Sequence, residues 1–351
     1  MAARALVFTA RKQDTGRTVG DVIRKEFGLV AHDFARAKYR TENGITVDGK
    51  PAMANRRLTA GETLTVLLED GEPGRIIPAR GPLSVLYEDE DVIAVDKPAG
   101  MVVHPSHGHF ADTLANYLAQ YFLDRGEPHE IRPAGRLDKD TSGVLLFGKS
   151  RTACAHLAAG ASRNKQYLAL ASGVFANPEG TVRAPISREY EEKIRRVVRP
   201  DGAEAVTHYR VLRQYADCAL LTLTLETGRT HQIRVHMAYL GHPLLGDPIY
   251  GSGVLLPEQC TGRTMEAYPA QLRLTDGERA ERIRANRGFV RTALHAWRVT
   301  FLQPFSREPV AVTAPLPADF RRVIAEEGDD FRLVREEGTV RSGLTAFRPH
   351  S

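Results

Sequence analysis

The sequence predicts an α+β fold preceded by a small N-terminal α/β module, and three observations support this. Short apolar runs that end at polar or turn-forming residues, such as Val144–Phe147, are typical of buried strands. Segments with helical spacing and capping residues lie between such runs. A stretch rich in Pro and Gly separates an early segment from a longer one. We therefore expect a module over residues 1–72, a linker over 73–82, a large domain over 83–325 and a charged C-terminal extension over 326–351.

The composition narrows the class of protein. The 351 residues are 42% hydrophobic and 26% charged, which allows a sizeable core, and the formal net charge of +5 favours an anionic partner such as nucleic acid. The three cysteines form no Cys-x-x-Cys pair, so neither a disulfide framework nor a zinc cluster is expected. No apolar run approaches the roughly 18 residues of a membrane span, and the N-terminus lacks the apolar core of a signal peptide. The expected location is the cytoplasm, away from membranes.

The N-terminal module shows two helix signals and a hairpin signal. Thr18 can cap a first helix, and a second is expected to start after Asp33. Arg36 and Arg40 would share one face of the second helix, where a phosphate backbone or solvent would relieve their repulsion. The segment Gly44–Lys50 predicts a hairpin, because Asp-Gly favours a two-residue turn, and an alternating strand follows.

The large domain begins with two strand-like segments around an acidic turn, followed by the loop Asp96–Gly100. The nearby His104, His107 and His109 lack supporting ligands, so no metal site is expected there. A helix is predicted from Asp112, and a further one is capped by Ser150. The remaining expectations are a strand over Asn164–Leu170, strands within 181–213, a strand over Cys218–Glu226, a polar and irregular segment over 252–293, and a last strand pair near Ala293–Phe301 and Val310–Val312.

The segment Ala134–Gly143 is a polar loop joined directly to the apolar run that follows it. One reading is an ordinary turn, because Asp, Ser and Gly favour turns for backbone reasons alone. A calcium loop is excluded, since Lys149 stands where the twelfth position requires a bidentate Glu. The other reading is a functional loop. Asp138 lies beside Arg136 and Lys139, whose charges favour an ionised carboxylate that can act as a base or nucleophile.

The segment Thr227–Gly241 predicts a turn followed by a short helix. Thr230 can cap the helix, and its apolar stripe would run from Ile233 to Leu240. Arg234 lies outside this stripe. Because a helix N-terminus presents free backbone donors, the segment can contact an anion.

Several separated segments together resemble the RluA-type family of RNA pseudouridine synthases. They are Arg136–Gly143, Lys165–Tyr167, and Thr227–His236 with the Gly-His-Pro-Leu-Leu-Gly-Asp that follows, supported by Asp96–Gly100 and Leu294–Ala296. This resemblance spans about residues 83–324. The first 70 residues, with two helices, the Gly-Ile-Thr-Val-Asp-Gly-Lys hairpin and a strand, are similar to the RNA-binding module named after ribosomal protein S-four.

The resemblance implies a mixed, mostly antiparallel central sheet with a catalytic cleft and flanking helices and loops. It implies isomerisation of uridine to pseudouridine in RNA, in which the N1–C1′ bond breaks and the base rejoins through C5, without metal or cofactor. Ribosomal RNA is the expected substrate, with transfer RNA as the second candidate. The protein is expected to be a monomer.

The resemblance also assigns the site residues. Asp138 is implied as the essential carboxylate, and whether it attacks the sugar, attacks the base or removes a sugar proton stays open. Arg234 is the expected cationic partner of Asp138. Tyr167, which by its apolar surroundings alone would be a core aromatic, is expected to stack on the flipped base and assist proton removal at C5. Contacts with RNA are expected from Arg136, Lys165, Arg229, Arg36, Arg40 and Lys50.

Two departures and two alternatives accompany this assignment. The segment over 252–293 looks longer than the family core needs, so a different selection of substrate is expected. Many family members carry His before Arg-Leu-Asp, whereas this chain has Gly135, which leaves no side chain there to position a base. A first alternative is a non-catalytic RNA-binding or ribosome-assembly factor that keeps the fold. A second is a glycosidic hydrolase that uses Asp138 and Asp140, which requires two carboxyls about 5–10 Å apart across one bond.

Overall fold

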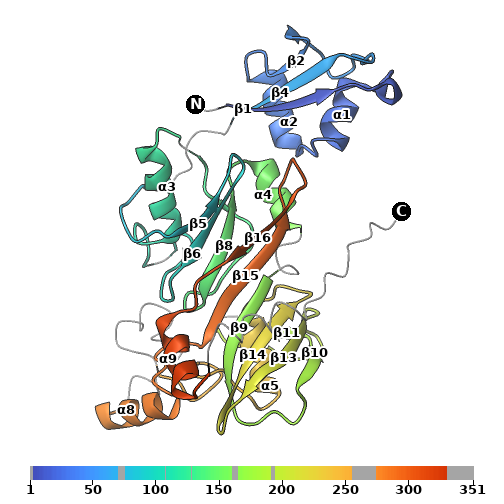
Figure 1. Cartoon of the computed structure of the whole chain (residues 1–351). Coiled ribbons are helices and arrows are strands. Elements are labelled where there is room, and N and C mark those ends of the chain that lie inside the picture. The colour runs from blue at the N-terminus through green and yellow to red at the C-terminus, as the bar shows by residue number, and fades with distance from the viewer. Residues whose placement is uncertain are drawn as a thin grey trace.

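The computed structural model describes residues 3–69, 76–106, 108–127, 129–159, 165–190, 194–254 and 274–329. The described strands form sheets of four, ten and two strands. Figure 1 shows the four-stranded sheet and its helices at one end of the molecule, and the ten-stranded sheet running through the larger remainder. No helix in the described part of the chain is long and apolar enough to cross a membrane.

The N-terminal sheet has the strand order β1-β4-β2-β3, and its helices pack on it through one apolar core. Asp48 and Gly49 have φ angles of 50° and 74°, as the predicted two-residue turn requires. Thr18 caps the first helix, as predicted, by accepting a hydrogen bond from the Asp21 amide. The elements are β1 (Ala3–Thr9), the short 3-10 helix η1 (Lys12–Asp14), α1 (Val19–Lys25), α2 (Ala31–Tyr39), β2 (Ile45–Val47), β3 (Lys50–Pro51) and β4 (Thr63–Glu69).

The second helix starts earlier than predicted, at Ala31, and Asp33 lies within its first turn. The Asp33 carboxylate accepts hydrogen bonds from the amide and the hydroxyl of Thr152, at 2.9 and 2.7 Å. Thr152 belongs to α4 (Arg151–Ala158) of the larger part. Asp33 therefore supplies a negative charge to the N-terminus of a distant helix and ties the two parts together. A local capping rule could not reveal this partner.

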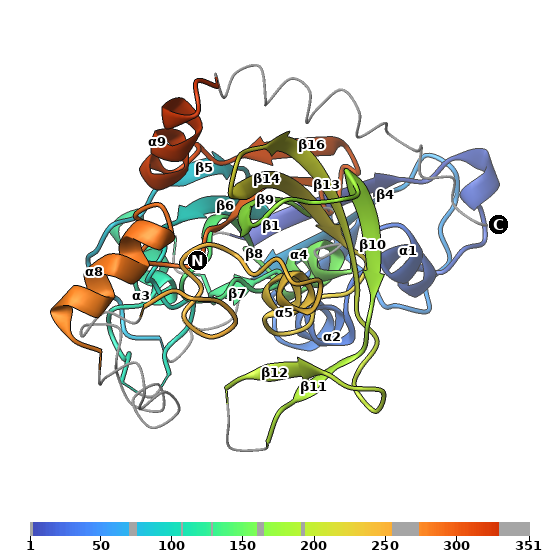
Figure 2. The same ribbon diagram turned by 90° about the horizontal axis from the view of Figure 1, so that it is seen from below.

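The ten-stranded sheet is mixed and mostly antiparallel, which confirms the predicted fold class. Among the described strands, only β8 and β15 pair in parallel. A separate hairpin, β11 (Ile186–Arg188) with β12 (Arg196–Val198), projects from the body in Figure 2. The main order is β10 (Glu179–Arg183), β13 (Val206–Gln214), β14 (Cys218–Leu225), β9 (Lys165–Ser172), β15 (Leu294–Leu302), β8 (Ser142–Gly148), β6 (Val92–Lys97) and β5 (Val85–Glu88), with β16 (Pro309–Thr313) beside β15 and β7 (Arg132–Pro133) beside β8.

The helices of the larger part are α3 (Leu114–Asp124), α4, α5 (Gln232–Tyr239), α8 (Asp276–Ala285) and α9 (Ala318–Glu326). Two sequence predictions were wrong here. Helix α3 starts at Leu114 rather than Asp112, because Thr113 forms the capping box with Asn116. The segment over 252–293 is not irregular throughout, since Thr275 and Glu278 form the capping box of α8. Helix α8 buries no residue, so the apolar spacing that identifies most helices was missing.

The central strand β8 is buried on both faces, which explains its continuous apolar run. Leu145 and Phe147 pack with α3 on one side, while Val144 and Leu146 pack with α4 on the other. At the start of β8, Gly143 has a φ angle of +110°, and a Cβ there would lie 2.2 Å from the Ala296 carbonyl oxygen of β15. Glycine is therefore required where the polar loop enters the sheet.

Candidate active site

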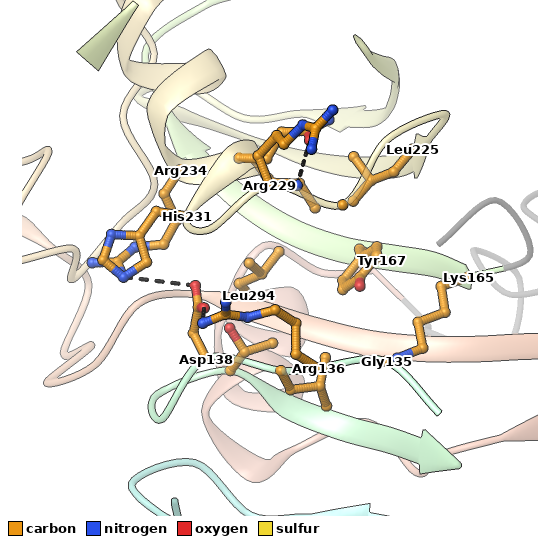
Figure 3. Close-up of a pocket in the computed structure, with 15 residues that line it drawn as sticks. Gly135, Arg136, Asp138, Lys165, Tyr167, Leu225, Arg229, His231, Arg234 and Leu294 are labelled. Atoms are coloured by element: carbon orange, nitrogen blue, oxygen red, sulfur yellow. Dashed lines mark hydrogen bonds and ion pairs between the residues drawn. The ribbon is translucent and has the colours of Figure 1, made fainter. Parts of the chain in front are cut away.

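A pocket of about 280 Å³ lies at the centre of the large sheet. This is near the lower limit of ligand pockets, roughly 300 Å³, and leaves room for one base with its sugar. Figure 3 shows side chains converging on it from the loop before β8, from β9 and from the turn before α5. Its lining comprises Gly135, Arg136, Leu137, Asp138, Thr141, Lys165, Tyr167, Leu225, Gly228, Arg229, His231, Gln232, Ile233, Arg234 and Leu294.

Asp138 is the one acidic residue among these lining residues, and its side chain is 18% exposed. One carboxylate oxygen lies 3.9 Å from Nη1 of Arg234, and the other lies 4.0 Å from Nη2 of Arg136. Arg234 approaches from the buried side, whereas the Arg136 side chain is 61% exposed. The carboxylate therefore lies between a buried cation and an exposed one, and its remaining surface faces the pocket.

Arg234 makes its closest contacts with Asp247, a residue that the sequence reasoning did not single out. Nε and Nη2 of Arg234 donate to the two carboxylate oxygens of Asp247 at 2.6 and 2.8 Å, which is a bidentate pair. Burial alone would raise the pKa of Asp247, but the Arg234 charge and the amides of Ile249 and Tyr250 lower it overall. The sequence offers no periodic signal for this pair, because the two residues come from a helix and a loop. The pair leaves Nη1 of Arg234 directed at Asp138.

Lys165 and Tyr167 lie two residues apart on β9, so their side chains share one face of the sheet. That face lines the pocket. Tyr167 belongs to the apolar core as well as to the pocket lining. Burial, together with the negative charge of Asp138, raises the pKa of Tyr167 well above that of a free phenol. The Tyr167 hydroxyl is therefore protonated at neutral pH.

The turn before α5 differs from its prediction. His231, not Thr230, is the N-cap, and it has a left-handed backbone with φ 59° and no side-chain cap. Thr230 instead accepts a hydrogen bond from Nη1 of Arg136 at 3.0 Å. Gln232 holds the turn, because its side-chain oxygen accepts from the Arg229 amide and from the Thr227 hydroxyl, each at 2.9 Å. A strained residue held in this way is common at functional sites.

The predicted apolar stripe of α5 is only partly correct. Ile233 and Met237 are buried, but Leu240 is exposed and Arg234 is buried. The buried pair with Asp247 compensates the charge of Arg234, which a count of apolar positions does not anticipate. Burial and the charge of Arg234 lower the pKa of His231, at the N-cap, to about 4, so its imidazole is neutral at physiological pH.

Gly135 lines the mouth of the pocket with a φ angle of +100°. This is a backbone conformation that other residues rarely adopt. The glycine therefore suits the path of this loop, and the position offers no side chain to a ligand. Arg136 and Arg229 are the exposed cations at the same mouth.

The sequence profile of the family described as RNA pseudouridylate synthase matches residues 91–239. A ribosomal large subunit pseudouridine synthase D of Xanthomonas campestris is 38% identical over 81% of this chain and 81% of that protein. The protein of the same name from Escherichia coli K12 is 33% identical over 96% of this chain and 99% of its own length. This chain belongs to the RNA pseudouridylate synthase family.

Two further comparisons accompany this assignment. The uncharacterised RNA pseudouridine synthase YhcT of Bacillus subtilis is 35% identical over 80% of this chain and 83% of that protein. The solved structure of human RNA pseudouridylate synthase domain containing 1 aligns with a TM-score of 0.48 and 26% identity, over 70% of this chain and 87% of that one. As a pseudouridine synthase the protein is an isomerase, and its substrate is RNA.

A buried lysine holds the loop of the synthase that carries Asp138. Nζ of Lys97, at the end of β6, donates to the carbonyl oxygens of Pro98, Met101 and Lys139 at 2.8, 3.0 and 2.8 Å. The Gly100 amide donates to the same Lys139 oxygen at 2.9 Å. Burial lowers the pKa of Lys97 to about 7, although the charges of Asp140 and Asp138 oppose this. Through its three hydrogen bonds, the Nζ group of Lys97 holds the backbone next to Asp138.

We expect Lys97→Met to lower the rate of the synthase by roughly 10–100-fold, because a displacement of about 1 Å at a catalytic group can cost that much. The carbonyl oxygens of Pro98 and Met101 would also lose the lysine donor, whereas the Lys139 oxygen keeps the Gly100 amide. An acceptor left without a partner away from water can cost about 1–3 kcal/mol of unfolding free energy. Urea denaturation measures the second effect, and the turnover of folded protein measures the first. A folded variant with wild-type turnover would show that the lysine does not position this loop.

The other sequence-predicted residues lie away from the pocket. Arg36 on α2, with its half-buried side chain, Arg40 after α2 and Lys50 on β3 belong to the N-terminal module, where Arg40 and Lys50 are exposed. Asp140 does not line the pocket, and its Oδ1 is buried without a hydrogen bond partner. His107 lies outside the described residues. Within the described ranges, no three His, Cys, Asp or Glu side chains are grouped to hold a metal.

Proposed function

We propose that this synthase converts uridine to pseudouridine in ribosomal RNA, acting as a monomer in the cytoplasm, with Asp138 as the essential carboxylate. The observation that carries the assignment is the carboxylate of Asp138, set between Arg234 and Arg136 in a pocket of about 280 Å³. The printed names of the relatives from Xanthomonas campestris and Escherichia coli, ribosomal large subunit pseudouridine synthase D, support ribosomal RNA as the substrate.

The pocket geometry supports a division of roles. A target base must leave its stack to enter, which costs a few kcal/mol in a duplex. Arg136, exposed and hydrogen-bonded to Thr230, stands at the mouth where the RNA backbone would pass. Arg234, held by Asp247, orients Asp138 toward C1′ of the flipped nucleotide. Tyr167 offers a buried aromatic face for stacking, and its protonated hydroxyl can donate but is a poor base.

The N-terminal module is proposed to be an S-four-type RNA-binding domain over residues 1–72. Its exposed Arg40 and Lys50 offer charge to a phosphate backbone. The contact of Asp33 with Thr152 and the bond from the Val30 amide to the Thr152 hydroxyl, at 3.2 Å, hold this module against the synthase domain. A fixed second RNA contact would give the enzyme its choice among uridines.

Tritium release tests the reaction and the substrate together. The protein is incubated with RNA labelled with tritium at C5 of uridine, as ribosomal RNA in one sample and transfer RNA in another. Formation of the C5–C1′ bond expels the C5 hydrogen, so we expect release from ribosomal RNA with the strand and the base retained. Release from transfer RNA but not from ribosomal RNA would mean that transfer RNA is the substrate. No release from any RNA fraction by folded protein would contradict the proposed function.

The two alternative functions are less well supported. A glycosidic hydrolase requires two carboxyls facing one bond, whereas Asp138 is the one acidic residue among the described lining residues. A non-catalytic RNA-binding factor does not require a carboxylate placed between two arginines. In the tritium assay, a hydrolase would release free base, which separates that alternative from the isomerase.

A further inference from the structure

Lys165 is a buried lysine on the wall of the pocket. It begins β9, lies two residues before Tyr167 on the same face of the sheet, and is only 2% exposed. In Figure 3 its side chain reaches toward Gly135, across the view from Asp138 and Arg234. An RNA phosphate, which the sequence suggested as its contact, would remain at the exposed mouth near Arg136 and Arg229.

The ammonium of Lys165 forms no hydrogen bond or ion pair with any part of the chain that the structure describes. The other buried lysines are compensated. Lys97 donates to three carbonyl oxygens, and Lys149 lies 2.6 Å from a carboxylate oxygen of Glu88. A buried cation without a partner is costly, and it persists where a ligand supplies the missing negative charge.

Burial lowers the pKa of Lys165 to about 8, without a compensating carboxylate, so most of the molecules carry the ammonium at pH 7. The negative charge of Asp138 raises the pKa of Tyr167, whereas burial alone accounts for the lowered pKa of Lys165. The side chains in Figure 3 give the pocket two distinct ends. One end holds the carboxylate and its arginines, and the other holds an isolated ammonium beside the tyrosine.

The isomerisation generates a negative charge that could occupy the second end. When the N1–C1′ bond breaks, N1 keeps the electron pair, and the detached uracil carries a negative charge spread over its two carbonyl oxygens. After the base turns, an electron pair from C5 forms the new bond to C1′, C5 loses its proton, and N1 gains one. The charge is largest between these steps, which is where a fixed donor lowers the barrier.

Resting on the proposed function, we propose that Lys165 donates a hydrogen bond to a carbonyl oxygen of the flipped uracil and stabilises the negative charge of the detached base. The sugar of the nucleotide then lies at Asp138, and the base spans the pocket beside Tyr167. The lysine keeps its proton throughout, so it acts by charge and not by proton transfer. Its role is therefore in the chemical step and not in RNA affinity.

The test compares Lys165→Met with wild type on tritium-labelled ribosomal RNA, measuring both the single-turnover rate and the Kd. We expect the rate to fall by about 10²–10³-fold, as when one donor to a developing anion is removed, and the Kd to change by less than about 3-fold. Met replaces an unpaired buried charge, so the variant is expected to melt no lower than wild type. Lost activity then cannot be attributed to unfolding.

Two controls sharpen this test. Lys149→Met also removes a buried lysine, but one that contacts Glu88 outside the pocket, and its single-turnover rate should match wild type. Lys165→Arg keeps a cation and should recover part of the rate. The wild-type rate is expected to decline as the pH rises above about 8, where the ammonium loses its proton, and Lys165→Arg should remove this decline.

Three results would count against the proposal. A Lys165→Met protein with the wild-type rate would exclude a role in the chemical step. A large rise in Kd with an unchanged rate, and a weaker dependence of binding on salt, would indicate a phosphate contact instead. A wild-type chain that releases no tritium would overturn the proposed function as well, whereas an active wild type with an unaffected variant would overturn this inference alone.

Discussion

Asp138→Asn is expected to lower turnover by at least ~10⁴-fold, the order of magnitude lost when a nucleophile or its base is removed from other enzymes. The amide has nearly the same shape as the carboxylate but carries no charge, so it can neither attack nor accept a proton. The pocket offers no replacement, because Asp138 is the one acidic residue in its described lining. Affinity for RNA should stay within a few-fold, since Arg136 and the N-terminal module are unchanged.

Single-turnover tritium release and a parallel binding titration measure the two effects of this substitution. Asp140→Asn is the matched control, two residues away in the same loop. We expect it to lose far less activity than Asp138→Asn, because Asp140 does not line the pocket and acts only through its charge on Lys97. Inactivation by both substitutions would favour the hydrolase, which uses two carboxylates. An Asp138→Asn enzyme with wild-type turnover would show that the Asp138 carboxylate is not essential for the reaction.

Asp247→Asn is expected to reduce both stability and activity. The substitution leaves Arg234 buried without its bidentate partner, and breaking a buried ion pair in this way costs about 3–5 kcal/mol of unfolding free energy. Arg234 would then turn toward Asp138, its remaining carboxylate, and misplace it. Urea denaturation measures the first effect and single-turnover kinetics on folded protein measures the second.

The same pair predicts a pH dependence. The pKa of Asp247 is lower in the folded protein than in the unfolded chain, so its contribution to stability is complete above the unfolded value of about 3.9. This contribution is lost as the pH falls through the lower, folded value. We therefore expect the free energies of unfolding of wild type and Asp247→Asn to converge as the pH falls below about 4.

The double variant Arg234→Met with Asp247→Leu separates the two functions of the pair. Replacing a buried ion pair by apolar residues is often neutral or stabilising, so this protein should recover most of the stability that Asp247→Asn loses. It should stay inactive, because no cation then orients Asp138. Recovery of activity together with stability would mean that the pair only supports the fold.

The sequence predicted the elements whose signal is local. Val144–Phe147 is a strand because a buried strand leaves a continuous apolar run, and Thr18 caps a helix because its partner lies three residues away. Asp48 and Gly49 make the predicted turn because the conformation of a two-residue turn depends on these two adjacent residues. The capping box of α8 is also a local signal, but the helix has no buried apolar face, so apolar spacing does not predict it.

Contacts between distant segments escaped these local rules. The local pattern predicts Asp33 as the start of a helix, yet its carboxylate accepts from Thr152. The pattern likewise predicts Thr230 as a cap, yet its hydroxyl accepts from Arg136. Both side chains are short polar groups that hydrogen bond with whatever donor folding brings near. Their roles depend on long-range contacts, which spacing along the chain does not encode.

The sequence by itself determined the family and the reaction class, and it predicted Asp138 as the essential carboxylate, because long ordered motifs are local in the chain. Only the tertiary structure decided how that carboxylate is held. It brought Asp247 to Arg234 and directed Lys97 at the backbone of the loop that carries Asp138. It also left Lys165 buried in the pocket with no hydrogen-bond or ion-pair partner among the residues that the structure describes. The physical reason is that the charge a buried side chain needs nearby comes from segments that meet only when the sheet forms.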